Sequence, residues 1–141
     1  MLPEERISIR VETEVMAPIT KVWMIWNDPA YITKWYNASD DWHAPFAENN
    51  LKVGDQFKIR MAAKDGSVEF DFIGVYTLIK EHEQIEYRIE DGRKVSVSFD
   101  DLGKSTKVIE IFEAENVHPP EVQKGGWQAI LDSFKKCVES N

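Results

Sequence analysis

The chain has 141 residues, of which 43% are hydrophobic and 30% are charged, and its formal net charge is −8 at pH 7. This length predicts a single domain over residues 1–141, and the composition is typical of a globular rather than a disordered protein. Nucleic acid is not expected as a partner, because phosphate backbones repel an acidic chain whose lysines and arginines are interleaved with acids.

Three features of the sequence bear on location. No apolar run approaches 18 residues, so we expect no membrane insertion. Residues 1–10 lack the basic-then-apolar pattern of a secretory signal. Cys137 is the only cysteine, which excludes an internal disulfide and fits a reducing compartment. Together these features predict a cytoplasmic protein.

The first third of the chain predicts one strand followed by two short helices. Apolar and polar residues alternate from 7 to 15, which predicts a strand with one buried face. After Ala17-Pro18, helical spacing over residues 19–26 predicts a short helix. Asp28 and Pro29 suit the N-cap and the first position of a second short helix. Residues 37–50 show no such period, and we expect them to be irregular and polar.

Residues 51–115 predict antiparallel strands joined by tight turns. Gly54-Asp55 indicates a turn, and Asp-Gly pairs at 65–66 and 91–92 are strong hairpin signals. Gly74 lies inside one of the strands, where a glycine often marks a bulge or bend. The last strand, residues 106–115, carries apolar residues on both of its faces. The sequence therefore does not determine which face points inward.

Residues 121–139 predict a long amphipathic helix, because their apolar residues recur at spacings of three, four and seven. Gly125 and Gly126 lie inside it, at a cost of roughly 1 kcal/mol each relative to alanine. Two explanations remain open. Tight packing of the helix backbone against a neighbouring element is the favoured one, and free space beside Trp127 is the alternative.

This order of elements predicts an α+β fold. Hairpin turns make the sheet antiparallel, and its apolar face must be covered by the only long amphipathic element, the terminal helix. We therefore expect a curved antiparallel sheet of six or seven strands around the C-terminal helix.

The order of these elements and several of their motifs resemble those of a known family. The chain is similar to the SRPBCC (START/Bet v 1-like) superfamily, in the branch named for homology to the activator of Hsp90 ATPase. The motifs that carry the resemblance are Ala17-Pro18 with Val22-Trp23, Asp28-Pro29 with Lys34-Trp35-Tyr36, Val53-Gly54 before Phe57, Phe70-Asp71-Phe72 with Gly74 and Tyr76, and Gly126-Trp127 with Ile130-Leu131 and Phe134. Asp55 and Cys137 depart from the pattern, since many members have glycine and close relatives often have an aromatic residue there.

The resemblance implies a helix-grip fold whose sheet and long helix enclose an apolar cavity. Superfamily members use this cavity for lipids, hormones and polyketides, and some use it for catalysis, whereas most members of this branch have no assigned biochemical function. We expect the following residues to line it: Phe57, Ile59, Met61, Phe70, Phe72, Tyr87, Phe99, Gly126, Trp127, Ile130, Leu131 and Phe134.

Few residues point to catalysis. No histidine or cysteine pair has metal-ligand spacing, so neither a metal nor a cofactor is expected. Glu110, Tyr87 and His43 are the weak catalytic candidates, although we expect Glu110 to point outward and His43 to be a surface residue. Cys137 is expected to be partly buried, with its pKa lowered a little by the neighbouring lysines.

Three functions are compatible with these patterns. The first is binding of an apolar small molecule, lipid-like or aromatic, without catalysis. The second is a co-chaperone-like domain with a chaperone as protein partner, and the third is a cyclase-like or hydrolase-like enzyme that uses the same cavity. A monomer or weak homodimer is expected in each case.

Overall fold

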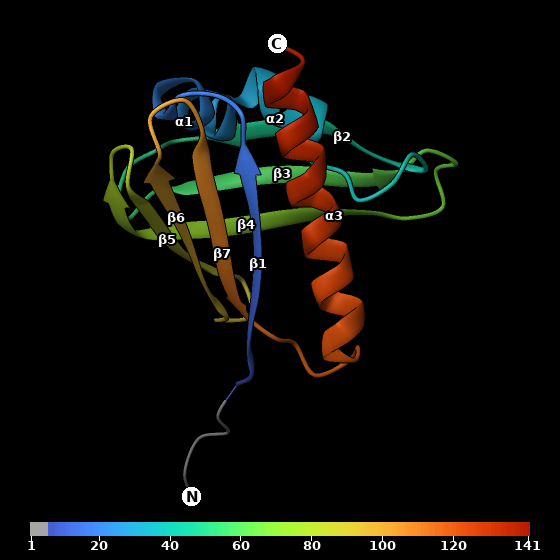
Figure 1. Ribbon diagram of the computed structural model, residues 1–141. Helices are drawn as coiled ribbons and strands as arrows, with labels where there is room; N and C mark the ends of the chain where they lie inside the picture. Colours follow the sequence, from blue (N-terminus) through green and yellow to red (C-terminus); the bar gives the residue numbers. More distant parts are fainter. Residues whose placement is uncertain (1–5) are drawn as a thin grey trace, which may run out of the picture.

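The computed structural model describes residues 6–141 and has the expected α+β architecture (Figure 1). Residues 1–5, part of the stretch expected to lack a secretory signal, lie outside the described residues. The strands are β1 (Ser8–Val15), β2 (Trp42–Asn49), β3 (Gln56–Ala63), β4 (Glu69–Lys80), β5 (Gln84–Ile89), β6 (Lys94–Asp101) and β7 (Thr106–Glu113). The helices are α1 (Ile19–Asn27), α2 (Pro29–Trp35) and α3 (Pro120–Glu139).

The strands form one curled sheet in the order β1-β7-β6-β5-β4-β3-β2, and every neighbouring pair is antiparallel. The long helix α3 crosses the concave side of this sheet, while α1 and α2 lie together at one end (Figure 1). This confirms the helix-grip fold. No helix among residues 6–141 is long and apolar enough to cross a membrane.

Local sequence signals explain the first two helices. Asp28 ends α1 and caps α2, since its Oδ1 accepts a hydrogen bond from the backbone N–H of Ala30 at 2.9 Å. Pro29 occupies the first helical position, where its missing N–H has no partner to lose. Both helices are confirmed.

The prediction for residues 37–50 is wrong in part, because β2 occupies residues 42–49 and pairs with β3. The register shifts between His43 and Phe46, and Pro45 lies inside this shift. A bulge breaks the alternation of apolar and polar residues that identifies a strand in a sequence. Proline is tolerated because β2 is the edge strand of the sheet.

Gly74 is needed for close packing rather than for a bulge. The register of β4 shifts between Tyr76 and Leu78, not at the glycine. A Cβ built on Gly74 would lie 2.8 Å from Cδ2 of Tyr87 and even closer to the ring of Phe57. The two aromatic rings therefore meet over a bare piece of backbone.

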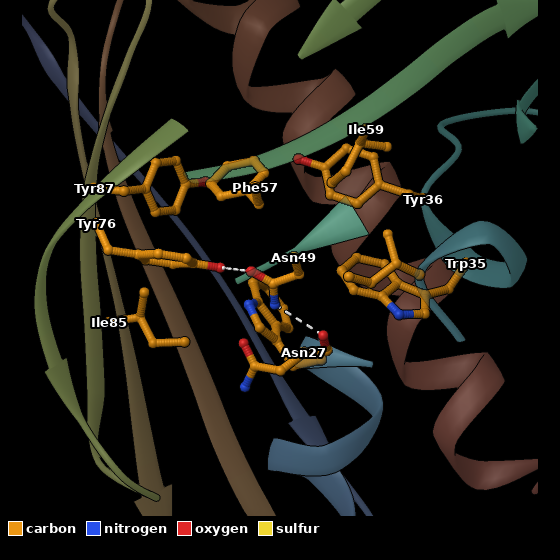
Figure 2. A pocket seen from close by; sticks show the side chains of 11 residues that line it. Asn27, Trp35, Tyr36, Asn49, Phe57, Ile59, Tyr76, Ile85 and Tyr87 are labelled. Carbon is orange, nitrogen blue, oxygen red and sulfur yellow. Dashed lines mark hydrogen bonds between the residues drawn. The ribbon is translucent and has the colours of Figure 1, made fainter. Parts of the chain in front are cut away.

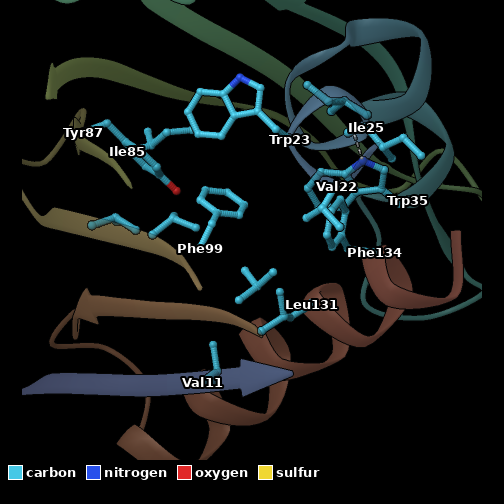
Figure 3. Packing of buried hydrophobic residues seen from close by; sticks show 14 of the residues in the cluster. Val11, Val22, Trp23, Ile25, Trp35, Ile85, Tyr87, Phe99, Leu131 and Phe134 are labelled. Atoms are coloured by element: carbon cyan, nitrogen blue, oxygen red, sulfur yellow. Dashed lines mark hydrogen bonds between the residues drawn. The ribbon is translucent and has the colours of Figure 1, made fainter. Parts of the chain in front are cut away.

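The core lies between the sheet, α1, α2 and the second half of α3 (Figure 3). Phe134 of α3 is fully buried, with its ring centroid 4.8 Å from those of Trp26 and Trp35. Trp35 also donates a hydrogen bond from Nε1 to the carbonyl oxygen of Ile25 at 3.1 Å. Trp26 and Trp35 thus pack against the terminal helix.

Candidate functional site

A cavity of about 370 Å³ lies between the first half of α3 and the inner face of the sheet. Its walls combine the end of α2, strands β3 and β4, and the helix α3, with one residue from β7. The apolar lining residues are Trp26, Trp35, Tyr36, Ala38, Met61, Phe70, Phe72, Val122, Gly126, Trp127 and Ile130, and the polar ones are Arg93, Glu110, His118 and Gln123.

The glycine pair in α3 leaves space rather than allowing close packing. A Cβ built on Gly125 or on Gly126 would meet no atom within 4 Å. The favoured explanation, tight packing of the backbone, is therefore wrong, and the alternative of free space beside Trp127 is confirmed at Gly126, which lines the cavity. The Trp127 ring stacks on Phe112 with centroids 3.9 Å apart and planes at 8°. This stacking holds the ring against the sheet and keeps it from filling the cavity.

Glu110 points into the protein and is only 5% exposed, which contradicts the expected outward orientation. The inner face of β7 carries Val108, Glu110 and Phe112, whereas Ile109 and Ile111 lie on the outer face. Burial alone raises the pKa of the Glu110 carboxyl to about 8, because the charged form loses its water. At neutral pH the unliganded protein therefore holds this carboxyl mostly protonated.

Two tyrosine hydroxyls share the electrostatic environment of Glu110. Burial raises the pKa of Tyr36 and of Tyr87 well above the usual value, and the negative charge of Glu110 raises both further. Neither hydroxyl forms a hydrogen bond with any of residues 6–141, and the Glu110 carboxyl has no such bond either. Every fully occluded side-chain nitrogen or oxygen in this part of the chain has a partner, so these three groups border open space.

A smaller cavity of about 30 Å³ meets the larger one at Tyr36 (Figure 2). Its polar side is already organised, since the Tyr76 hydroxyl donates to Oδ1 of Asn49 at 2.5 Å. Nδ2 of Asn49 in turn donates to the carbonyl oxygen of Asn27 at 2.8 Å. This volume has room for about one or two water molecules, too little for an organic ligand.

The polar groups at the rim of the larger cavity already have partners within the protein. Nε of Arg93 lies 2.7 Å from Oδ2 of Asp91, and Nδ1 of His118 lies 2.9 Å from Oε1 of Glu115. The buried Gln123 side chain donates to the carbonyl oxygens of Glu115 and His118, which fixes the chain just before α3. Among residues 6–141, no group of three or more histidine, cysteine or acidic side chains is placed to hold a metal.

The expected cavity residues fall into three sets. Six line the larger cavity: Met61, Phe70, Phe72, Gly126, Trp127 and Ile130. Three line the smaller one: Phe57, Ile59 and Tyr87. The remaining three, Phe99, Leu131 and Phe134, line neither cavity and belong to the packed core.

The three weak catalytic candidates lie in different environments. Glu110 and Tyr87 are buried on the inner face of the sheet, whereas His43 is exposed on the edge strand β2. Tyr36, Arg93 and Gln123 also line the larger cavity and were not among the expected cavity residues. Tyr36 follows the last residue of α2, and its inward helical spacing was the only available signal.

Cys137 lies half-buried near the end of α3. Burial raises the pKa of its thiol, while the positive charge of Lys34 opposes this effect only in part. The expected lowering by the neighbouring lysines is therefore wrong, and its partial burial is confirmed.

Comparisons with known proteins agree with this architecture. The family described as activator of Hsp90 ATPase homolog 1-like protein matches residues 16–139. The solution structure of an AHSA1-like protein from Aeromonas hydrophila is 42% identical, with a TM-score of 0.89 over 95% of this chain and 93% of that one. A protein from Cytophaga hutchinsonii is 52% identical, with a TM-score of 0.82 over the same shares of the two chains.

A crystal structure from Chromobacterium violaceum, at 22% identity and a TM-score of 0.83, covers 95% of this chain and 98% of that one and shares the fold. No curated protein matches the chain. The match over residues 16–139, with the two closely similar structures, shows that the chain belongs to the activator of Hsp90 ATPase homolog 1-like family.

Proposed function

We propose that the protein binds an apolar small molecule, lipid-like or aromatic, in the cavity between the sheet and the first half of α3. The observation that carries this proposal is the open space at Gly126, where a helix gives up stability and no side chain fills the gap. A volume of about 370 Å³ lies within the range of small-molecule sites. A cavity of about 150 Å³ holds one benzene ring, so this one has room for two or three fused rings or a short acyl chain.

The walls also have the chemistry of a binding site. Phe72, Trp127 and Ile130 offer apolar surface, and a few polar groups remain at the floor and rim to orient a ligand. Phe70 and Val122 are about half exposed, at 47% and 59%, beside the cavity. A ligand that enters there would cover both side chains and gain further apolar contact.

A second candidate function is acid–base catalysis on a molecule held in the same cavity. It is favoured by Glu110, whose pKa of about 8 suits proton transfer near neutral pH, and by the unpartnered hydroxyls of Tyr36 and Tyr87. If the native protein converts a cyclase-type or ester substrate and the Glu110→Gln variant does not, this candidate is supported. Unchanged turnover in that variant would remove it.

Partners and location belong to the same proposal. The chaperone alternative rests on the family description, and a pull-down at low salt that recovers no chaperone would count against it. A cytoplasmic location is part of the proposal, because a single cysteine, Cys137, fits a reducing compartment.

An amide NMR titration with fatty acids, sterols and flat polyphenols tests the proposal. We expect shifts at Met61, Phe72, Gly126 and Trp127, which line the cavity from both sides. Ile111 lies on the opposite face of β7 and serves as the internal control, because it should not shift. Silence across the panel, or shifts spread equally to Ile111, would contradict binding in the cavity.

A further inference from the structure

Glu110 is an unpaired acid in the wall of an otherwise apolar cavity. The residue is 5% exposed, and no residue among 6–141 forms a hydrogen bond or an ion pair with its carboxyl. Buried carboxyls in proteins are normally hydrogen-bonded or paired, because an isolated one is costly to ionise. The carboxyl borders open space in the cavity, so a bound molecule can reach it.

The groups around Glu110 do not supply the missing positive charge. Tyr36 after α2, Tyr76 on β4 and Tyr87 on β5 stay neutral because burial raises the pKa of each hydroxyl. The cavity-lining residues of α3, such as Gln123, carry no charge.

Two cationic or titratable groups reach the rim of the cavity, and both are engaged elsewhere. Arg93, in the turn between β5 and β6, is paired with Asp91, and His118, before α3, is paired with Glu115. No described residue therefore pairs a positive charge with Glu110, and a cationic ligand is the remaining source of one.

The remaining walls also favour a cation. The aromatic side chains of Trp127, Tyr36 and Phe72 line the same space. Aromatic rings attract cations within about 6 Å of their centroids. The net charge of −8 draws cations toward the protein from a distance.

From this arrangement we infer that the ligand is an organic cation, with an aromatic or apolar body and a protonated amine that pairs with the Glu110 carboxylate. This inference rests on the proposed binding function and names its ligand class. Below pH 8 the carboxyl must first lose its proton, so binding releases one proton to the solvent. An alkylamine remains charged over this range, because its own pKa is about 10.

Three probes with one ring system test the inference: naphthylethylamine, naphthylethanol and naphthylacetate. At pH 8 we expect the amine to bind about tenfold to a hundredfold more tightly than the alcohol, and the acetate to bind most weakly. Between pH 6 and pH 8 the amine affinity should rise about tenfold per pH unit, while the alcohol affinity stays constant. Calorimetry in buffers of different ionisation enthalpy should record proton release for the amine alone.

Glu110→Gln is the matched variant, since it keeps the shape of the side chain and removes its charge. It should lose the preference for the amine and keep the affinity for the alcohol, which also shows that the variant is folded. Equal binding of amine and alcohol by the native protein, or tightest binding of the acetate, would overturn the cation inference and leave cavity binding intact. If none of the three probes bound, both proposals would fall.

Discussion

Substitution of Gly126 tests whether the cavity is open. A Cβ at this position would meet no atom within 4 Å, so Gly126→Ala meets no steric cost. It gains the helix propensity that glycine lacks, roughly 1 kcal/mol in the free energy of unfolding. For a chain of 141 residues this raises Tm by about 4 °C.

Gly125 provides the matched control, because it lies one residue away in α3 and is exposed to solvent. Gly125→Ala should raise Tm by the same amount. The two positions should differ only for a larger side chain. Gly126→Leu places four carbon atoms inside the cavity and should weaken ligand binding by at least about tenfold, whereas Gly125→Leu should leave binding unchanged.

Thermal unfolding followed by circular dichroism and a fluorescence titration of the tryptophans measure both effects. A lower Tm for Gly126→Ala together with a higher Tm for Gly125→Ala would refute the reasoning. That result would mean that the helix backbone packs tightly at residue 126 and that no cavity lies there.

Three further predictions follow from buried positions. Glu110 has a folded pKa of about 8 and an ordinary value of 4.5, so the folded state holds its proton longer and the free energy of unfolding falls as pH rises between these values. Measured by urea unfolding, the free energy of unfolding should fall by about 1.4 kcal/mol per pH unit. Glu110→Gln should reduce this dependence on pH. An equal dependence in the variant would show that other groups cause it. Gly74→Ala should lower stability by about 1–3 kcal/mol, the opposite sign from Gly126→Ala, because its Cβ overlaps the rings of Phe57 and Tyr87; a rise in Tm would contradict this. Phe134→Ala should lower the free energy of unfolding, measured by urea titration, by about 3–5 kcal/mol, and a loss under about 1 kcal/mol would show that the core readily collapses there.

Regular patterns made most of the fold predictable from the sequence. The period of two in β1, the Asp28-Pro29 start of α2 and the amphipathic period of α3 each reflect local physics that acts on a few neighbouring residues. β2 escaped detection because the bulge around Pro45 breaks its period. These residues form a strand because they pair with β3, and the residues of β2 alone do not predict this pairing.

The cavity was harder to predict than the fold, because its position depends on how much of α3 the core occupies. The helix has 20 residues and is therefore about 30 Å long. Its second half, including Leu131 and Phe134, is buried in the core beside α1 and α2. Only the first half, with Gly126 and Trp127, covers open space. The sequence places all four residues on one face and does not say where along that face the packing stops.

Glu110 illustrates a different limit. Both faces of β7 are apolar enough to be buried, so the parity of the strand is undecided until its register with β1 and β6 is known. In that register Glu110 pairs with Val11 and Val97, two fully buried residues, and its carboxyl enters the core face of the sheet.

Two positions that reduce the stability of this protein border the same cavity. Gly126 weakens the helix by roughly 1 kcal/mol, and Glu110 introduces an uncompensated acid where an apolar residue would be more stable. Sequences agree with their fold at most positions, and the exceptions concentrate at functional sites. A larger residue at 126 and an apolar one at 110 would give a better-packed core of the same fold. Gly126 and Glu110 both border the same cavity of about 370 Å³. This coincidence is the strongest reason to regard the cavity as a binding site rather than a packing defect.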